Sequence, residues 1–125
     1  MSTVRWLKVS VLVLVLAVTS SGCGKSKSKS ASTSSGTKVE AYDFRFDPKA
    51  LNVKAGQKVT LTFKNEGKAE HNFSVTSLAV DRDAESDATQ TVTFTAPGSA
   101  GDVQFFCKYH KDSHNMVGTL HVSAS

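Results

Sequence analysis

The residues of this chain best suited to do chemistry lie close together near its C-terminal end. Cys107, His110, His114 and Met116 fall within ten residues of one another, and His71 lies well upstream. Thiolate and thioether sulfur favour copper(I), and imidazole also suits copper(II). One thiolate, two imidazoles and a weak axial thioether form the ligand set of a copper site that exchanges single electrons. We therefore expect one copper ion, cycling between Cu(I) and Cu(II), bound by His71, Cys107, His110 and Met116.

Two extended segments must position this loop. Residues 103–106 lead into it and residues 117–122 lead out of it, and both are rich in β-branched and aromatic side chains, which is typical of strands. A lone Cys or Met is more simply explained as a small or flexible core residue. The combination of the four residue types, with their spacing between two strands, is what predicts a metal site rather than ordinary packing.

The strand signals begin at residue 38 and continue to the end of the chain. In residues 58–64, Val and Leu or Phe alternate with Thr, which places apolar side chains on one face of a strand. Several short segments of this kind and no helix-length period predict an all-β fold, a Greek-key antiparallel β-sandwich with a core of phenylalanines. The acidic residues of the stretch 78–90 alternate with small and basic ones, and we expect a solvated loop there.

The first 23 residues are expected to form a signal peptide. Arg5 and Lys8 precede a run of Val and Leu in residues 9–18 that is too short to span a bilayer as a stable helix. Small residues then lead to Cys23, which resembles a bacterial lipoprotein cleavage site and predicts lipidation of Cys23. Ser20 stands where that pattern usually has an aliphatic residue, so ordinary signal cleavage remains open, and an uncleaved membrane anchor is a further alternative.

Residues 24–37 are rich in Lys and Ser and predict a solvated tether, which leaves residues 38–125 as the copper-binding domain. The chain has fifteen basic and eleven acidic residues, and five of the basic ones precede the domain: Arg5, Lys8, Lys25, Lys27 and Lys29. The domain therefore carries ten basic against eleven acidic residues, without a basic stripe. This balance argues against nucleic acid as a partner.

The pattern resembles the cupredoxins, small blue copper proteins such as plastocyanin, pseudoazurin and halocyanin. The resemblance is carried by His71-Asn72-Phe73 and by Cys107-x2-His110-x5-Met116 with its Gly-Thr-Leu exit. It implies equatorial ligands His71, Cys107 and His110, an axial Met116, and hydrogen bonding from Asn72 across to the ligand loop. In plastocyanin-like loops the Met follows the second His after four residues rather than five, so His114 is an alternative to His110.

The resemblance also implies a function. Family members pass single electrons between larger redox proteins, so we expect a monomeric carrier, not an enzyme, tethered by lipid to the outer face of the cytoplasmic membrane. An alternative of another class is extracytoplasmic copper storage or delivery with the same ligands. A third is a zinc-binding or metal-free domain that binds a protein partner, although zinc would leave Met116 without a purpose.

Overall fold

The computed structural model describes residues 34–125. The predicted signal peptide, the lipidation of Cys23 and most of the predicted tether therefore lie outside the described residues. The first strand begins at Ser34, four residues before the expected start of the domain. Within residues 34–125, no helix has the length and apolar character needed to cross a membrane.

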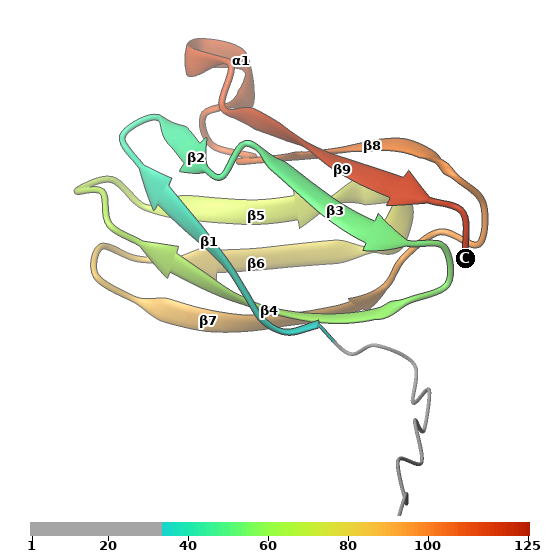
Figure 1. Ribbon diagram of the computed structural model, residues 1–125. Helices are drawn as coiled ribbons and strands as arrows, with labels where there is room; N and C mark the ends of the chain where they lie inside the picture. Colours follow the sequence, from blue (N-terminus) through green and yellow to red (C-terminus); the bar gives the residue numbers. More distant parts are fainter. Residues whose placement is uncertain (1–33) are drawn as a thin grey trace, which may run out of the picture.

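The regular secondary structure of the described part consists almost entirely of short strands (Figure 1). In chain order these are β1 (Ser34–Tyr42), β2 (Arg45–Asp47), β3 (Ala50–Lys54), β4 (Lys58–Asn65), β5 (His71–Val75), β6 (Val80–Ala84), β7 (Thr89–Thr95), β8 (Gly101–Phe106) and β9 (Val117–Ser123). The helical pieces are a 3-10 turn, η1 (Thr76–Leu78), and one short helix, α1 (Lys111–His114), which projects between β8 and β9.

The strands form two sheets, with the orders β2-β1-β4-β7 and β3-β9-β8-β5-β6. The predicted β-sandwich is confirmed, but the sheets are mixed rather than antiparallel throughout. β1 pairs with β4 in parallel, and β3 pairs with β9 in parallel, while the other pairs are antiparallel. The chain crosses between the sheets after β2 and again after β3, so strands that run the same way become neighbours. Alternation within one strand carries no information about the direction of its neighbour.

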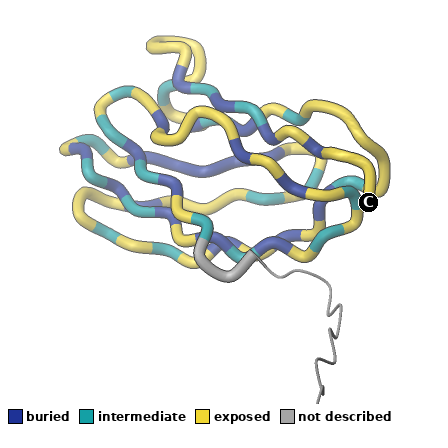
Figure 2. The backbone as a smooth tube through the Cα atoms, in the orientation of Figure 1, coloured by how far each residue is buried: buried dark blue, intermediate teal, exposed yellow. Residues whose placement is uncertain are grey.

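Four phenylalanines from both sheets form the centre of the core. Phe46 of β2 and Phe63 of β4 meet Phe73 of β5 and Phe105 of β8, with ring centroids 5.0–6.4 Å apart. All four side chains are fully buried, and Figure 2 shows the buried positions along the strands. Aromatic pairs at these separations stabilise a core beyond the area that they bury. The sandwich is thus packed directly beneath β5 and β8, the strands that lead to the predicted ligands.

The expectation of a solvated loop over residues 78–90 is wrong. This stretch contains η1 and β6, and β7 already begins at Thr89. β6 is the edge strand next to β5, and most of its residues, including Asp81 and Asp83, are exposed. Charged side chains are usual on an edge strand because they discourage pairing with another chain. Their presence made this strand look like a loop in the sequence.

Gly118 lies opposite Phe105 in the β8–β9 pair and allows close packing under the ligand loop. A Cβ at this position would overlap the ring of Phe105 and lie 2.8 Å from the carbonyl oxygen of Lys49. We expect Gly118→Ala to lower the free energy of unfolding by about 1–3 kcal/mol, the range for overpacked cores. Urea unfolding of the metal-free protein measures this. Gly98→Ala, which adds a Cβ into open space, is the control and should change it by less than about 0.5 kcal/mol.

Candidate metal centre

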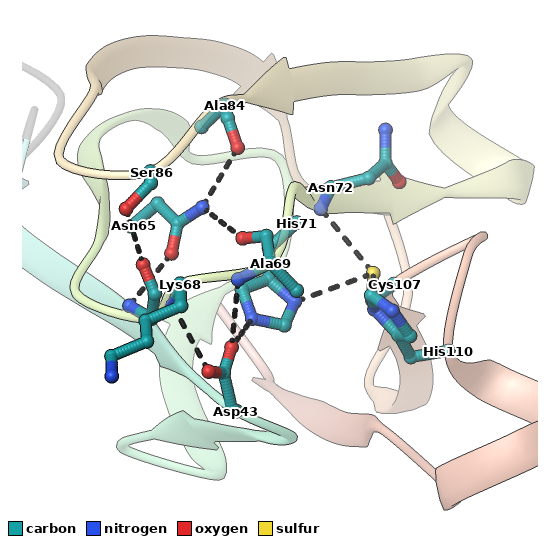
Figure 3. Close-up of polar contacts among 11 residues, drawn as sticks. Asp43, Asn65, Lys68, Ala69, His71, Asn72, Ala84, Ser86, Cys107 and His110 are labelled. Carbon is teal, nitrogen blue, oxygen red and sulfur yellow. Dashed lines mark hydrogen bonds and ion pairs between the residues drawn. The ribbon is translucent and has the colours of Figure 1, made fainter.

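The structure brings His71, Cys107 and His110 together at one end of the sandwich. His71 is the first residue of β5, Cys107 directly follows β8, and His110 directly precedes α1. Their potential ligand atoms all lie within 4.8 Å of one another. The Cys107 Sγ lies 3.4 Å from His110 Nδ1 and 3.9 Å from His71 Nδ1, so both rings present the same nitrogen to the sulfur (Figure 3). One thiol and two imidazoles that converge in this way fit a copper or zinc ion.

The burial of the three residues differs in a way that matters for exchange with solvent. His71 and Cys107 are fully buried, whereas His110 is half-buried. Burial lowers the pKa of His110, and His71 and His114 lower it further by their positive charge when protonated. A lowered pKa keeps the His110 imidazole neutral at pH 7, and a neutral imidazole is the form that binds a metal.

The loop after β8 is held by its own backbone. The Cys107 carbonyl accepts hydrogen bonds from the N–H groups of His110 and Lys111, at 3.1 and 2.8 Å. The Cys107 N–H donates to the Met116 carbonyl at 3.0 Å, and the Met116 N–H donates to the His110 carbonyl at 3.3 Å. Met116 is buried, with 1% of its surface exposed. The backbone thus ties Met116 to Cys107, while axial binding by its thioether stays a prediction.

His114, the alternative to His110, lies outside the three-residue cluster. Its ring stacks on Phe44 with centroids 3.8 Å apart and an 18° angle between the planes. Its Nδ1 is within 2.8 Å of the Ser113 hydroxyl, and the residue is exposed. Phe44 in turn lies 4.6 Å from the His110 ring, and the His110 and His114 rings are 5.7 Å apart, yet His114 does not share the cluster of ligand atoms. This geometry favours His110 as the second imidazole.

Asn72 connects the ligand loop to the sheet. Its backbone N–H points at the Cys107 Sγ, 3.3 Å away, and its side-chain oxygen accepts from the Lys108 N–H at 3.4 Å and from the Ser74 hydroxyl. This N–H fixes the position of the Cys107 sulfur relative to β5.

Asn72 is itself held by the acidic side chains of the edge strand β6. Its amide nitrogen donates to Asp81 at 2.6 Å and to Asp83 at 2.8 Å. Both carboxylates also pair with the Lys108 ammonium, at 3.0 and 2.8 Å, and this contact is the largest cause that lowers their pKa values. The residue that follows Cys107 is thereby anchored to the edge of the sheet.

Asp43, in the turn between β1 and β2, is a site residue that sequence reasoning missed. Its carboxylate accepts a hydrogen bond from His71 Nε2 at 2.9 Å, on the side of the ring opposite Cys107 (Figure 3). Hydrogen bonds from the Lys68 N–H, His71 and the Ala69 N–H lower the pKa of Asp43 to about 2. Asp43 is therefore ionised at neutral pH. Because a carboxylate only accepts, this contact places a proton on Nε2, and in the neutral ring the lone pair is then on Nδ1, the nitrogen that faces Cys107.

The loop before His71 is shaped by a buried asparagine. Asn65, at the end of β4, donates from its side chain to the carbonyls of Ala69 and Ala84, at 2.7 and 2.9 Å. Its side-chain oxygen accepts from the Gly67 N–H at 2.8 Å. The Ser86 hydroxyl donates to the Gly67 carbonyl at 2.8 Å. These bonds fix the path by which the chain enters β5, and so they fix where His71 begins.

The family comparison places most of the chain in one family. A family model described as a cupredoxin-like domain matches residues 10–122. No curated protein matches the chain.

Solved structures extend the comparison. The chain is similar to dithionite-reduced auracyanin from Roseiflexus castenholzii, with 22% identity, a TM-score of 0.62, and coverage of 73% of this chain and 98% of that chain. It is also similar to auracyanin A, described as a "blue" copper protein, from Chloroflexus aurantiacus, with 25% identity, a TM-score of 0.57, and coverage of 70% and 99%. The periplasmic domain of cytochrome oxidase subunit II from Bradyrhizobium japonicum shares the fold at 12% identity, a TM-score of 0.60, and coverage of 72% and 84%.

Proposed function

This chain belongs to the cupredoxin-like domain family, and on that premise we propose that it carries single electrons on one copper ion bound by His71, Cys107, His110 and Met116. The observation that carries the proposal is the convergence of one thiol and two imidazoles within 4.8 Å. Copper bound by such a set supplies a one-electron change between Cu(I) and Cu(II). The description of auracyanin A as a blue copper protein supports the choice of metal.

The protein around these ligands is suited to electron exchange without rearrangement. The energy needed to reorganise a redox site is small when its ligands keep the same positions in both oxidation states. This requires ligands on rigid elements with fixed neighbours. His71 starts a strand, Cys107 follows one, and Asn72 joins the two. Burial of Cys107 keeps water away from the sulfur.

The half-buried His110 marks the end of the site that a partner can approach. His71 and Cys107 have no exposed surface, while Tyr109, next to His110, is 44% exposed. We propose that another redox protein exchanges electrons with the chain at this end. Since four protein ligands leave no free position for a substrate, we propose a monomeric carrier rather than an enzyme.

The proposed location rests on the sequence before the described residues. The apolar run and Cys23 support export and lipid attachment, and the Lys/Ser-rich stretch that follows supports a tether. The related oxidase domain is described as periplasmic, which agrees with export. We propose that the domain is held at the outer face of the cytoplasmic membrane.

Copper storage or delivery with the same ligands is the competing function. A donor must hand its metal to an acceptor, which requires an accessible thiolate for ligand exchange. Cys107 is fully buried and its sulfur already receives the Asn72 N–H. The site is therefore better suited to keep copper in both oxidation states.

The visible spectrum of the protein loaded with one equivalent of Cu(II) tests the proposal. A short copper–thiolate bond absorbs intensely in the visible range, so the protein should be blue to green, lose its colour with one electron per copper, and regain it on oxidation. The reduced protein should also retain its copper against a Cu(I) chelator. A colourless Cu(II) protein would contradict the blue-copper site, and rapid loss of Cu(I) to the chelator would favour delivery.

Met116→Leu tests the axial ligand. We expect the colour to persist, because the equatorial donors remain. The midpoint potential should rise, because the loss of a donor destabilises Cu(II) more than Cu(I). The exchange nearly conserves volume, so the free energy of unfolding should fall by about 1.5 kcal/mol or less. Spectroelectrochemistry measures the potential. An unchanged potential would show that the Met116 thioether does not bind the metal.

A further inference from the structure

We propose that Asp43 is a positioning residue of the metal centre. Its carboxylate orients His71 by accepting the Nε2–H of that ring, and its negative charge favours the oxidised metal. The inference rests on the proposed function for the identity of the metal. It adds a residue that lies 28 positions from the histidine on which it acts. Its basis is the contact geometry on both sides of one imidazole ring.

The two nitrogens of His71 have different neighbours. Nε2 lies 2.9 Å from Asp43 Oδ1, and Nδ1 lies 3.9 Å from the Cys107 Sγ. The ring itself is fully buried, while the Asp43 carboxylate that covers Nε2 is partly exposed. Asp43 therefore decides which nitrogen carries the proton and which nitrogen is free to bind. A carboxylate in this place also makes the imidazole a stronger donor.

Asp43 is held in this position by the loop before β5. One carboxylate oxygen accepts from the Lys68 N–H at 3.0 Å, and the other accepts from the Ala69 N–H at 3.2 Å. Bonded on three sides, the carboxylate cannot turn away from the histidine without losing backbone partners.

The backbone of Gly67 packs closely against the hydrogen-bonded pair of Asp43 and His71. A Cβ on Gly67 would overlap Asp43 Oδ1 and lie 2.8 Å from His71 Nε2. The backbone thus packs against the hydrogen bond itself, and any side chain larger than hydrogen would separate the two residues. Gly67 offers a way to break the contact while both partners stay in the chain.

The charge of Asp43 acts on the two oxidation states unequally. A fixed negative charge close to the site stabilises Cu(II) more than Cu(I), since the energy of the interaction grows with the charge of the ion. Asp43→Asn keeps an oxygen for the His71 N–H and removes the charge. We expect it to shift the balance toward Cu(I) by about tenfold, which corresponds to a rise of ~59 mV for one electron.

Removal of the Asp43 hydrogen-bond acceptor should have a larger effect on the site than removal of its charge alone. In Asp43→Ala, the buried Nε2–H loses its partner, and we expect the affinity for Cu(II) to fall about 10–100-fold. Gly67→Ala should lower the affinity in the same direction, because it displaces Asp43 from His71. Glu66→Gln removes the ion pair with Lys64 in the same loop without touching Asp43 or His71, so it is the matched control for loop damage and should keep the affinity of the wild type.

The experiment combines these variants with a measurement that needs no copper. Two-bond ¹H–¹⁵N spectra of the metal-free full chain report the tautomer of His71, which should be Nε2–H in the wild type and in Asp43→Asn, and mixed in Asp43→Ala. Midpoint potentials then compare Asp43→Asn with Asp112→Asn, which removes a carboxylate from the exposed helix α1.

Two results would overturn the inference. One is an Nδ1–H tautomer of His71 in the wild type, which can be seen even if every Asp43 variant fails to fold. The other is a potential that moves no further in Asp43→Asn than in Asp112→Asn. Failure of the proposed function would give a different result, because the wild type would then be colourless with Cu(II). The His71 tautomer, which is measured without metal, would still decide the role of Asp43.

Discussion

Cys107→Ser is expected to abolish the visible colour of the Cu(II) protein. A hydroxyl stays protonated at neutral pH and cannot donate charge to the metal as a thiolate does, whereas a coordinating thiol is deprotonated outright. Cys107 is the only free cysteine among the described residues, so no other thiol in that part of the chain can serve in the same way. Absorption of the variant with one equivalent of Cu(II) measures the loss.

A control must separate loss of the ligand from loss of the fold. Serine is close to cysteine in size, and its oxygen can accept the Asn72 N–H that now points at the sulfur. The metal-free variant should therefore keep the far-ultraviolet circular dichroism of the wild type. If the variant keeps intense visible absorption, Cys107 is not the source of the colour and the ligand assignment fails.

The sequence was sufficient for the elements whose side chains obey one simple period. Residues 58–64 were expected to alternate, and β4 buries Val59, Leu61 and Phe63. The ligand loop was predictable for a different reason, because its donors lie close together along the chain. Backbone hydrogen bonds over a few residues hold such a loop, and local sequence determines them.

Contacts between distant segments could not be predicted in this way. Asp43 meets His71 only because β1, β2 and the loop before β5 converge in the folded sandwich, and an Asp in a turn has an ordinary explanation of its own. The charged residues of β6 made this strand resemble a loop in the sequence, although its carboxylates bind Asn72 by a hydrogen bond and Lys108 by an ion pair. Parallel pairing of β1 with β4 likewise depends on how the chain crosses between sheets.

His110→Ala and His114→Ala are expected to give opposite results. His110→Ala removes an equatorial donor from the cluster, so the colour should be lost or strongly weakened. His114→Ala removes only the ring stacked on Phe44 and should keep both the colour and one copper per chain. Absorption and metal analysis of the two variants, loaded side by side, make the comparison.

Burial predicts a further difference, between the two histidines of the cluster. His110 is half-buried, so its removal opens a gap that solvent and small molecules can enter, and added imidazole should restore much of the colour of His110→Ala. His71 is fully buried, and the gap left by His71→Ala is enclosed by the sandwich and the Asp43 turn, so imidazole should restore far less. If His114→Ala bleaches the site and His110→Ala does not, then His114 is the equatorial ligand, and the loop must rearrange around Phe44 when it takes up the metal.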